Sequence, residues 1–206
     1  MTSVRARVVV LAGPSGSGKS RLAARLGLPV LNLDDFYRDG DDPTLPHRGM
    51  GPGATMPDWD DPGSWLHDEA MLAIENLCRH GEANVPVYDI ARDARTGHRT
   101  LTLAESPYFV VEGIFAQEVV RDCRERGLLA DAVCLHHHRV VTFWRRLSRD
   151  FREHRKPPLV LVRRGLRLLK AEPAIVAQAV TLGCAPLRPE EAYARITWLV
   201  ESARRA

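Results

Sequence analysis

The sequence lacks long apolar segments and paired cysteines, and only 6% of its residues are aromatic. None of its hydrophobic runs reaches the roughly 20 residues that a membrane-spanning helix needs, so we expect no integral membrane protein. The short N-terminal stretch passes straight into a strand-like segment, which predicts no secretory signal and a cytoplasmic location. The four cysteines contain no Cys-x-x-Cys pair, and this favours reduced, partly buried thiols over disulfides.

A strong excess of charge of one sign is also missing. With 29 basic and 26 acidic residues the formal net charge is +3, which is too small to indicate a nucleic-acid partner. We therefore expect no nucleic acid and no membrane as partner, and the sequence leaves homo-oligomerisation open. Arginines are concentrated between residues 139 and 167, a pattern that suits a polyphosphate ligand.

The order of the predicted elements indicates a single domain over residues 1–206 with an α/β fold. Predominantly apolar segments at 8–11, 29–33, 108–113 and 132–135 predict strands of a mainly parallel central sheet, and helical segments lie between them. Ligands of such sheets bind at the carboxyl ends of the strands.

Other segments predict additions to this sheet. A helix is expected to begin at Asp61 and end near Gly81. Residues 84–103 predict a β-hairpin insertion, with strands at 85–90 and 99–103 and a turn at Thr96-Gly97. Residues 38–58 predict a long loop, residues from about 140 to 157 an amphipathic helix, and residues 159–206 mostly helix with a break near 183–186.

The segment Gly13-Pro14-Ser15-Gly16-Ser17-Gly18-Lys19-Ser20 matches the phosphate-binding P-loop pattern at every defined position. It follows an apolar strand and precedes a helix, which is the order that this loop requires. Its glycines let backbone N–H groups approach phosphates, Lys19 reaches the terminal phosphates and Ser20 coordinates Mg²⁺. The residues predicted to bind the nucleotide here are Gly13, Ser15, Gly16, Ser17, Gly18, Lys19 and Ser20. The expected cofactors are ATP, with GTP as the alternative donor, and Mg²⁺.

Two acids follow predicted strands. Asp34 can accept a proton from a substrate hydroxyl or hold Mg²⁺ through water, although aspartates also cap loops. Glu112 can complete the environment of the metal or be a solvated strand end. The predicted metal site is therefore Ser20, Asp34 and Glu112.

The remaining polar and aromatic clusters allow two interpretations each. The arginines of 145–155 share a helix face, which suits either phosphate oxygens or solvent. His136-His137-His138 is interpreted as a loop and not as a metal site, since adjacent residues cannot easily face one ion. Trp59, Trp65 and Tyr88 are either core residues or stacking surfaces for a base.

Taken in order, these motifs resemble the uridine/cytidine kinase family of P-loop nucleoside kinases, over about residues 8–156. The resemblance rests on the P-loop and on five further pieces, which are Asp34-Asp35-Phe36-Tyr37-Arg38, Trp59-Asp60-Asp61-Pro62, Pro86-Val87-Tyr88-Asp89-Ile90 with Arg95, Val111-Glu112-Gly113-Ile114, and Arg145-Arg146-Leu147-Ser148-Arg149-Asp150.

The resemblance implies a role for each matching residue. Asp34 would be the base at the ribose 5′-hydroxyl, and Asp60 would hold the ribose hydroxyls. Tyr37 and Tyr88 would line the nucleoside pocket, with Arg95 on the adjacent hairpin. The lid residues Arg146 and Arg149 would contact the ATP phosphates, so the implied catalytic set is Asp34, Lys19 and Arg149. Asp93 stands where the family usually has a histidine that reads the base, and base identity therefore stays open.

The function expected from the sequence is phosphorylation of a small-molecule nucleoside at its 5′-hydroxyl, with uridine or cytidine as the favoured acceptor. One alternative is a related P-loop kinase with another acceptor, such as phosphoribulose, pantothenate or nicotinamide riboside. A second alternative is a nucleotide-binding regulatory protein that hydrolyses ATP slowly and has no small acceptor.

Overall fold

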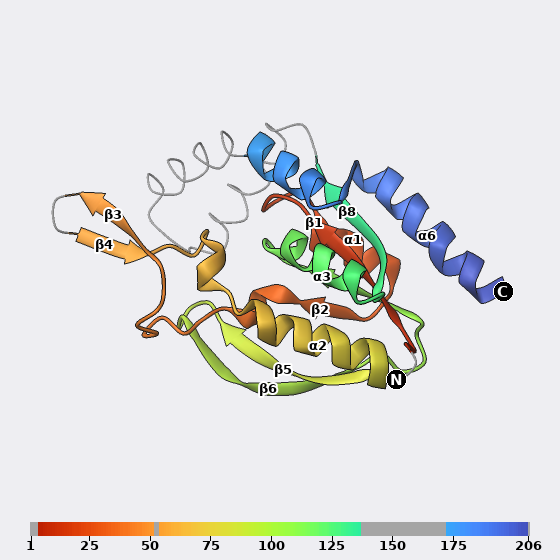
Figure 1. Cartoon of the computed structure of the whole chain (residues 1–206), viewed down its shortest axis with the longest axis horizontal. Coiled ribbons are helices and arrows are strands. Elements are labelled where there is room, and N and C mark those ends of the chain that lie inside the picture. The colour runs from red at the N-terminus through yellow and green to blue at the C-terminus, as the bar shows by residue number, and fades with distance from the viewer. Residues whose placement is uncertain (1–3, 52–53, 137–171, 206) are drawn as a thin grey trace.

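A computed structural model describes residues 4–51, 54–136 and 172–205 of the chain. Its centre is a five-stranded sheet in which all neighbouring strands run parallel (Figure 1). The strands follow the order β2 (Val30–Asn32), β7 (Tyr108–Glu112), β1 (Arg7–Ala12), β8 (Leu129–Leu135) and β9 (Ala185–Leu187). The expected mainly parallel α/β sheet is confirmed.

Helices cover both faces of this sheet. On one face lie α2 (His67–His80), the short η3 (Ala116–Val119), α3 (Val120–Glu125) and a helix over residues 172–181. On the other face lie α1 (Lys19–Leu26) and α6 (Pro189–Arg205). The arrangement is a three-layer α/β/α architecture, in agreement with the predicted α/β fold. No helix in the described ranges is both long and apolar enough to cross a bilayer.

The central strand β1 shows why the layers form. Residues 8–12 are all fully buried, and their side chains alternate between the two faces. Val8 and Val10 belong to the core under α2 and α3, whereas Val9 and Leu11 belong to the core under α1 and α6. A strand buried on both faces needs apolar residues at every position, and this is the pattern of the sequence.

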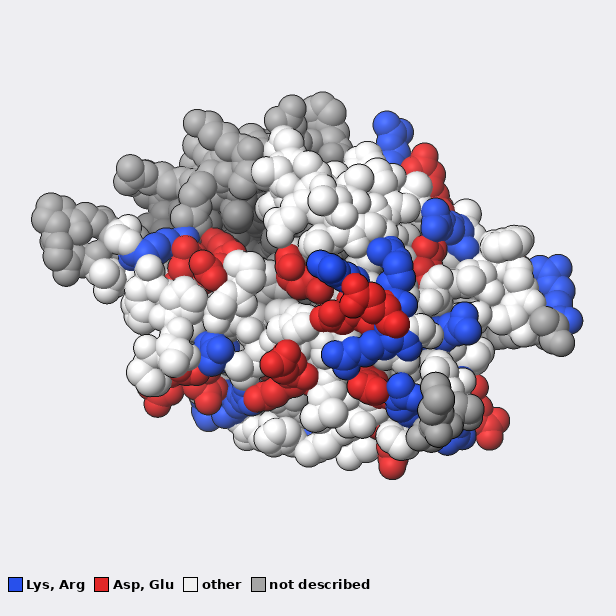
Figure 2. Space-filling view, viewed as in Figure 1, with Lys and Arg blue, Asp and Glu red and all other residues white. Residues whose placement is uncertain are grey.

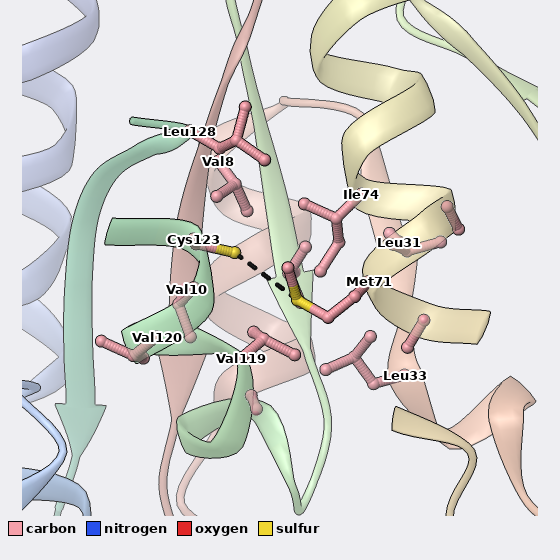
Figure 3. Close-up of a cluster of buried hydrophobic side chains, with 14 of the residues drawn as sticks. Val8, Val10, Leu31, Leu33, Met71, Ile74, Val119, Val120, Cys123 and Leu128 are labelled. Carbon is pink, nitrogen blue, oxygen red and sulfur yellow. Dashed lines mark hydrogen bonds between the residues drawn. The ribbon is translucent and has the colours of Figure 1, made fainter. Parts of the chain in front are cut away.

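The core between the sheet and α2–α3 is drawn in Figure 3. Met71 and Ile74 from α2 point toward Cys123 from α3 and toward the valines of β1. The sulfur atoms of Met71 and Cys123 lie 4.0 Å apart. All four cysteines are buried free thiols, and burial raises the pKa of the Cys123 thiol to about 12. These cysteines therefore act as small apolar residues.

Two antiparallel hairpins lie outside the central sheet. The hairpin β5 (Glu82–Asp89) and β6 (Ala94–Thr102) confirms the predicted insertion, but its turn occupies residues 90–93 instead of Thr96-Gly97. The amide of Ala91 donates to the side chain of Asp89 and Asp93 adopts a φ of 47°, so two aspartates form the turn. The second hairpin, β3 (His47–Gly51) and β4 (Ala54–Pro57), lies within the segment expected to be a loop.

Two other boundaries differ from the sequence expectation. Asp61 does cap a helical turn, because its carboxylate accepts from the amide of Gly63 at 2.7 Å. That turn is the short η2 (Pro62–Ser64), however, and α2 begins only at His67. The expected break near 183–186 contains the edge strand β9, which pairs with β8. The predicted lid over residues 140–157 lies outside the described residues.

Candidate active site

The P-loop joins β1 to α1 and forms a cradle from backbone. Gly13, Gly16 and Gly18 have positive φ angles of 132°, 84° and 94°, and residues other than glycine rarely adopt such backbone angles. A β-carbon at Gly13 would also collide with the carbonyl oxygen of Leu135 on β8. The loop conformation therefore depends on these glycines, and it places backbone N–H groups at the N-terminus of α1.

Lys19 lies across this cradle. Its ammonium group donates to the carbonyl oxygen of Gly13 at 2.8 Å and to that of Pro14 at 3.4 Å, and only 7% of the residue is exposed. The hydroxyl of Ser17 is fully buried and has no hydrogen-bond partner among the described residues. A charged lysine, an unpartnered hydroxyl and the backbone amides of a glycine-rich loop are groups that phosphate oxygens satisfy. The cradle therefore fits the phosphates of a nucleotide.

Glu112 and Asp34 are brought to the same edge by strand pairing. In the registers of β7 with its neighbours, Glu112 lies opposite Leu11 of β1 and Asn32 of β2. Asp34 follows in the short helical turn η1 (Leu33–Phe36), where its carboxylate accepts from the amide of Ile114 at 3.2 Å.

The spacing of the two acids depends on Gly113. A β-carbon at this position would lie 2.9 Å from the side chain of Leu33 and 3.0 Å from the carboxylate of Asp34. The absence of a side chain therefore lets the end of β7 pack directly against η1.

The environment of Glu112 suits a cation. Burial raises the pKa of this carboxyl, while a hydrogen bond from Ser20 and the charge of Lys19 oppose the rise. Ser20, Asp34 and Glu112 offer one hydroxyl and two carboxylates, which suits Mg²⁺ because this ion keeps several waters and binds phosphates. Among the described residues, no group of three or more histidine, cysteine or acidic side chains is arranged so that it could hold a metal ion by itself. The metal set of the sequence analysis stays a prediction.

An aromatic cluster begins three residues beyond Asp34. Tyr37 is its centre, with ring centroids 5.6 Å from Trp59, 5.9 Å from Tyr88 and 6.0 Å from Phe115. Sequence reasoning named the first three of these four residues but missed Phe115, which follows the β7 acid by three positions. Trp65 is only 4% exposed and packs against Phe115, so it is a core residue.

Both tyrosine hydroxyls are engaged with backbone. Tyr37 donates to the carbonyl oxygen of Trp59 at 3.1 Å, and Tyr88 donates to that of Arg38 at 3.2 Å. Burial raises the pKa of Tyr88, so its hydroxyl stays protonated at neutral pH. These bonds connect the segment after Asp34 to the β5–β6 hairpin and to the segment before η2.

Two aspartates attach the β5–β6 hairpin to the segment that follows Asp34. Asp35 accepts from the amide of Tyr88 at 3.5 Å and lies 3.8 Å from the guanidinium of Arg99. Asp39 accepts from the amide of Arg95 at 2.7 Å. Burial raises the pKa of Asp35. Because 53 and 56 residues separate these partners, sequence reasoning did not find either role.

Arg95 and Asp93 take part in the same attachment. The guanidinium of Arg95 donates to Glu69 of α2 at 2.9 Å and to the carbonyl oxygen of Tyr37 at 3.4 Å. The carbonyl oxygen of Asp93 accepts from the amide of Gly40 at 2.6 Å. The structure therefore places Arg95 beside the predicted pocket, with its side chain directed toward α2.

Asp60 lies on the opposite side of the cluster, between β4 and η2. Its amide donates to the side chain of Asp58 at 3.3 Å, and its carboxylate lies 3.6 Å from the guanidinium of Arg48. The predicted substrate residues Asp34, Tyr37, Asp60 and Tyr88 thus belong to one connected region. The predicted phosphate ligands Arg146 and Arg149 lie outside the described residues, as do His137 and His138.

Charge is mixed around this region. On the face that carries α2 and the β5–β6 hairpin, acidic and basic side chains are interspersed (Figure 2). This agrees with the nearly balanced formal charge of the chain.

The chain is similar in sequence to a plant pyrophosphatase and to several uridine kinases. No family model matches the chain. The inorganic pyrophosphatase TTM1 of Arabidopsis thaliana is 32% identical over 114 residues, which are 53% of this chain and 16% of that protein. The uridine kinase of Schizosaccharomyces pombe is 31% identical over 153 residues, 71% of this chain and 32% of that protein. The uridine kinase of Haemophilus influenzae is 26% identical over 157 residues, 71% of this chain and 69% of that protein.

The chain therefore spans 16% and 32% of the lengths of the plant and fission-yeast relatives. Among solved structures, a candidate fructose transport system kinase from Silicibacter sp. TM1040 superimposes with a TM-score of 0.59. It is 19% identical, and the match covers 84% of this chain and 85% of that one, which shows a shared fold. These similarities, together with the P-loop and the parallel sheet, show that the chain has the fold of P-loop kinases and resembles the uridine kinase family.

Proposed function

We propose that the protein transfers the γ-phosphate of ATP to the 5′-hydroxyl of a nucleoside, with uridine or cytidine as the acceptor. The observation that carries this proposal is the position of Asp34. It lies in η1, three residues before Tyr37, and its carboxylate accepts from the amide of Ile114 just after β7. Its charge also acts on Glu112, whose carboxylate is hydrogen-bonded to Ser20 of the P-loop. A base between a donor site and an acceptor site is the arrangement that phosphoryl transfer to a hydroxyl needs.

In the proposed reaction the acceptor oxygen attacks the γ-phosphorus and its proton passes to the carboxylate of Asp34. The bond between the γ-phosphorus and the β,γ-bridging oxygen breaks, and ADP leaves. Lys19 and the backbone amides of the cradle bind the phosphates and stabilise the charge that develops on them. Ser20, Asp34 and Glu112 would hold Mg²⁺, which neutralises charge on the phosphates when bound.

The acceptor site is proposed from the aromatic cluster and Asp60. Tyr37, Trp59 and Tyr88 offer ring surfaces for a planar base, while the carboxylate of Asp60 suits paired hydroxyls of a sugar. The two uridine kinases whose sequences align with 71% of the chain support this choice.

A panel of acceptors tests the proposal. The full chain with Mg²⁺ and either ATP or GTP is supplied with uridine, cytidine, purine nucleosides, nicotinamide riboside, pantothenate or phosphoribulose. ADP or GDP release is followed, and the phosphorylated product is identified by mass spectrometry. We expect turnover to depend on a pyrimidine nucleoside. Turnover only with another acceptor would contradict the choice of substrate, and slow hydrolysis that no acceptor stimulates would indicate a regulatory nucleotide-binding protein.

A further inference from the structure

The β3–β4 hairpin contributes one basic side chain to the region of Asp60. The hairpin is closed at its base by pairing of His47 with Pro57, and the next amide, that of Asp58, donates to the carbonyl oxygen of Pro46 at 2.7 Å. The chain therefore leaves the hairpin in a fixed direction and enters the segment Asp58-Trp59-Asp60.

Arg48 on β3 faces both carboxylates of this segment. Its guanidinium nitrogen lies 3.3 Å from the side chain of Asp58 and 3.6 Å from that of Asp60. The side chains of the three residues are 26%, 28% and 31% exposed, so all three are largely withdrawn from solvent. One positive charge thus lies between two negative charges that are only two residues apart.

The same segment is fixed from its other side by Tyr37. The hydroxyl of Tyr37 donates to the carbonyl oxygen of Trp59, between the two acids. Tyr37 follows Asp34 by three residues and shares the η1 region with it. Arg48 and Tyr37 together therefore determine where the carboxylate of Asp60 lies relative to Asp34.

We propose that Arg48 is a positioning residue for the acceptor, because its bridge to Asp58 holds the carboxylate of Asp60 toward the acceptor hydroxyls. This inference rests on the proposed function. Without Arg48 the two half-buried carboxylates would repel each other, and Asp60 would turn toward solvent.

The charge balance also sets a preference among acceptors. Arg48, Asp58 and Asp60 together carry a net charge of about −1 when all three are ionised. This cluster accommodates neutral or cationic polyhydroxylated acceptors and repels acceptors that already carry a phosphate. Uridine and nicotinamide riboside, whose sugar is not phosphorylated, are therefore favoured over phosphoribulose.

Steady-state kinetics with the full chain test the proposal. For Arg48→Gln we expect the KM for the acceptor to rise about tenfold, since a charged hydrogen-bonded partner is lost. We expect kcat and the KM for ATP to stay within about twofold, because neither the cradle nor Asp34 is touched. Arg48→Lys should recover most of the affinity. Adding Asp58→Asn to Arg48→Gln should recover part of it, because one of the repelling charges is removed.

Two controls separate positioning from a general effect on folding. Arg121→Gln breaks an ion pair with Glu125 that is 77% and 62% exposed, and it should change no kinetic constant. An acceptor without the 2′-hydroxyl, such as 2′-deoxyuridine, should lose less affinity than uridine on Arg48→Gln, because one of the hydroxyls that Asp60 binds is already absent.

The outcomes distinguish this inference from the proposed function. If uridine is not phosphorylated but another sugar hydroxyl is, the choice of substrate fails and the Arg48 series is measured on that acceptor. An unchanged acceptor KM for Arg48→Gln overturns the inference. So does an equal rise in both KM values that Asp58→Asn does not reverse. Absence of turnover with every polyhydroxylated acceptor overturns both proposals.

Discussion

The two sides of the proposed site, the phosphate cradle for the donor and the aromatic region for the acceptor, are built in different ways. The donor side is a short continuous segment, from Gly13 to Ser20, whose shape comes from backbone angles and from one buried lysine. The acceptor side combines η1, the β3–β4 hairpin and the β5–β6 hairpin through contacts between side chains and backbone. The donor side therefore depends on local sequence, whereas the acceptor side depends on the packing of distant segments. A change of acceptor needs few substitutions, and a change of donor chemistry would have to rebuild the loop.

The largest effect is expected from Lys19→Ala, which removes the charge from the donor side. We expect a loss of transfer of roughly 10²–10³-fold or more, because the variant removes the buried ammonium group that lies against the carbonyl oxygen of Gly13 in the cradle. Single-turnover assays with the acceptor saturating measure it. Circular dichroism should show an unchanged fold. Near wild-type transfer would break the assignment of the donor side.

Asp34→Asn tests the boundary between the two sides. Because the amide keeps the shape but cannot accept the proton, we expect kcat to fall roughly 10²-fold or more. The affinity for nucleotide in the absence of Mg²⁺, measured by titration calorimetry, should change little. The matched variant Asp35→Asn, on the neighbouring carboxylate that attaches the hairpin, should raise the acceptor KM and leave kcat much less affected. Equal effects of the two variants would show that Asp34 is not the base.

Tyr88→Phe should act on the acceptor side alone. It removes the hydrogen bond to the carbonyl oxygen of Arg38 and should lower the free energy of unfolding by about 1 kcal/mol. The acceptor KM should rise severalfold, because the hairpin loses one of its attachments, while the KM for ATP stays constant. Denaturant titration and initial rates check the two parts. A shift of the KM for ATP of the same size would mean that the two sides are not independent.

The smallest effect concerns pH and Glu112. Its pKa is raised, so the folded protein holds this proton more tightly than the unfolded chain does. The corresponding stability is present below the ordinary pKa of about 4.5 and is lost as pH rises through the higher folded value.

Glu112→Gln should therefore lose less stability than the wild type between pH 4 and pH 7 without nucleotide, as measured by thermal melting. With ATP and Mg²⁺ it should gain less stability than the wild type, because a carboxylate near the metal is gone. A steeper pH dependence in the variant would contradict the burial of this charge.

The difference between the two sides also explains what the sequence revealed. The P-loop, the buried strand β1 and helix α1 were predictable because adjacent residues determine them. The β3–β4 hairpin was missed because its glycine- and proline-rich strands gain their pairing from cross-strand contacts and not from an apolar pattern. The turn of the other hairpin was misplaced at Thr96-Gly97, since Asp89 and Asp93 provide an equally good turn that the sheet register selects.

The structure brings the predicted acceptor residues into one region, and their role there stays a prediction, but the contacts that hold them were not predicted. Arg95 was expected to lie beside the pocket, yet nothing in the sequence indicates that its amide binds Asp39 and its guanidinium binds Glu69. Arg48 showed no signal at all, because it lies 10 and 12 positions before its two acidic partners in a segment without periodicity. Contacts of this kind become visible only when the packing of the chain is known.

The hydroxyl groups of Tyr37 and Tyr88 both donate to backbone carbonyl oxygens, and this affects which bases the aromatic cluster can select. Tyr37 and Tyr88 cannot donate those protons to a base without breaking bonds that hold the segments together. We therefore expect the aromatic cluster to select a bound base by its width and flatness, and not through hydrogen bonds from these two hydroxyls. We expect an enzyme with such a pocket to treat uracil and cytosine almost alike and to discriminate against larger bicyclic bases through size alone.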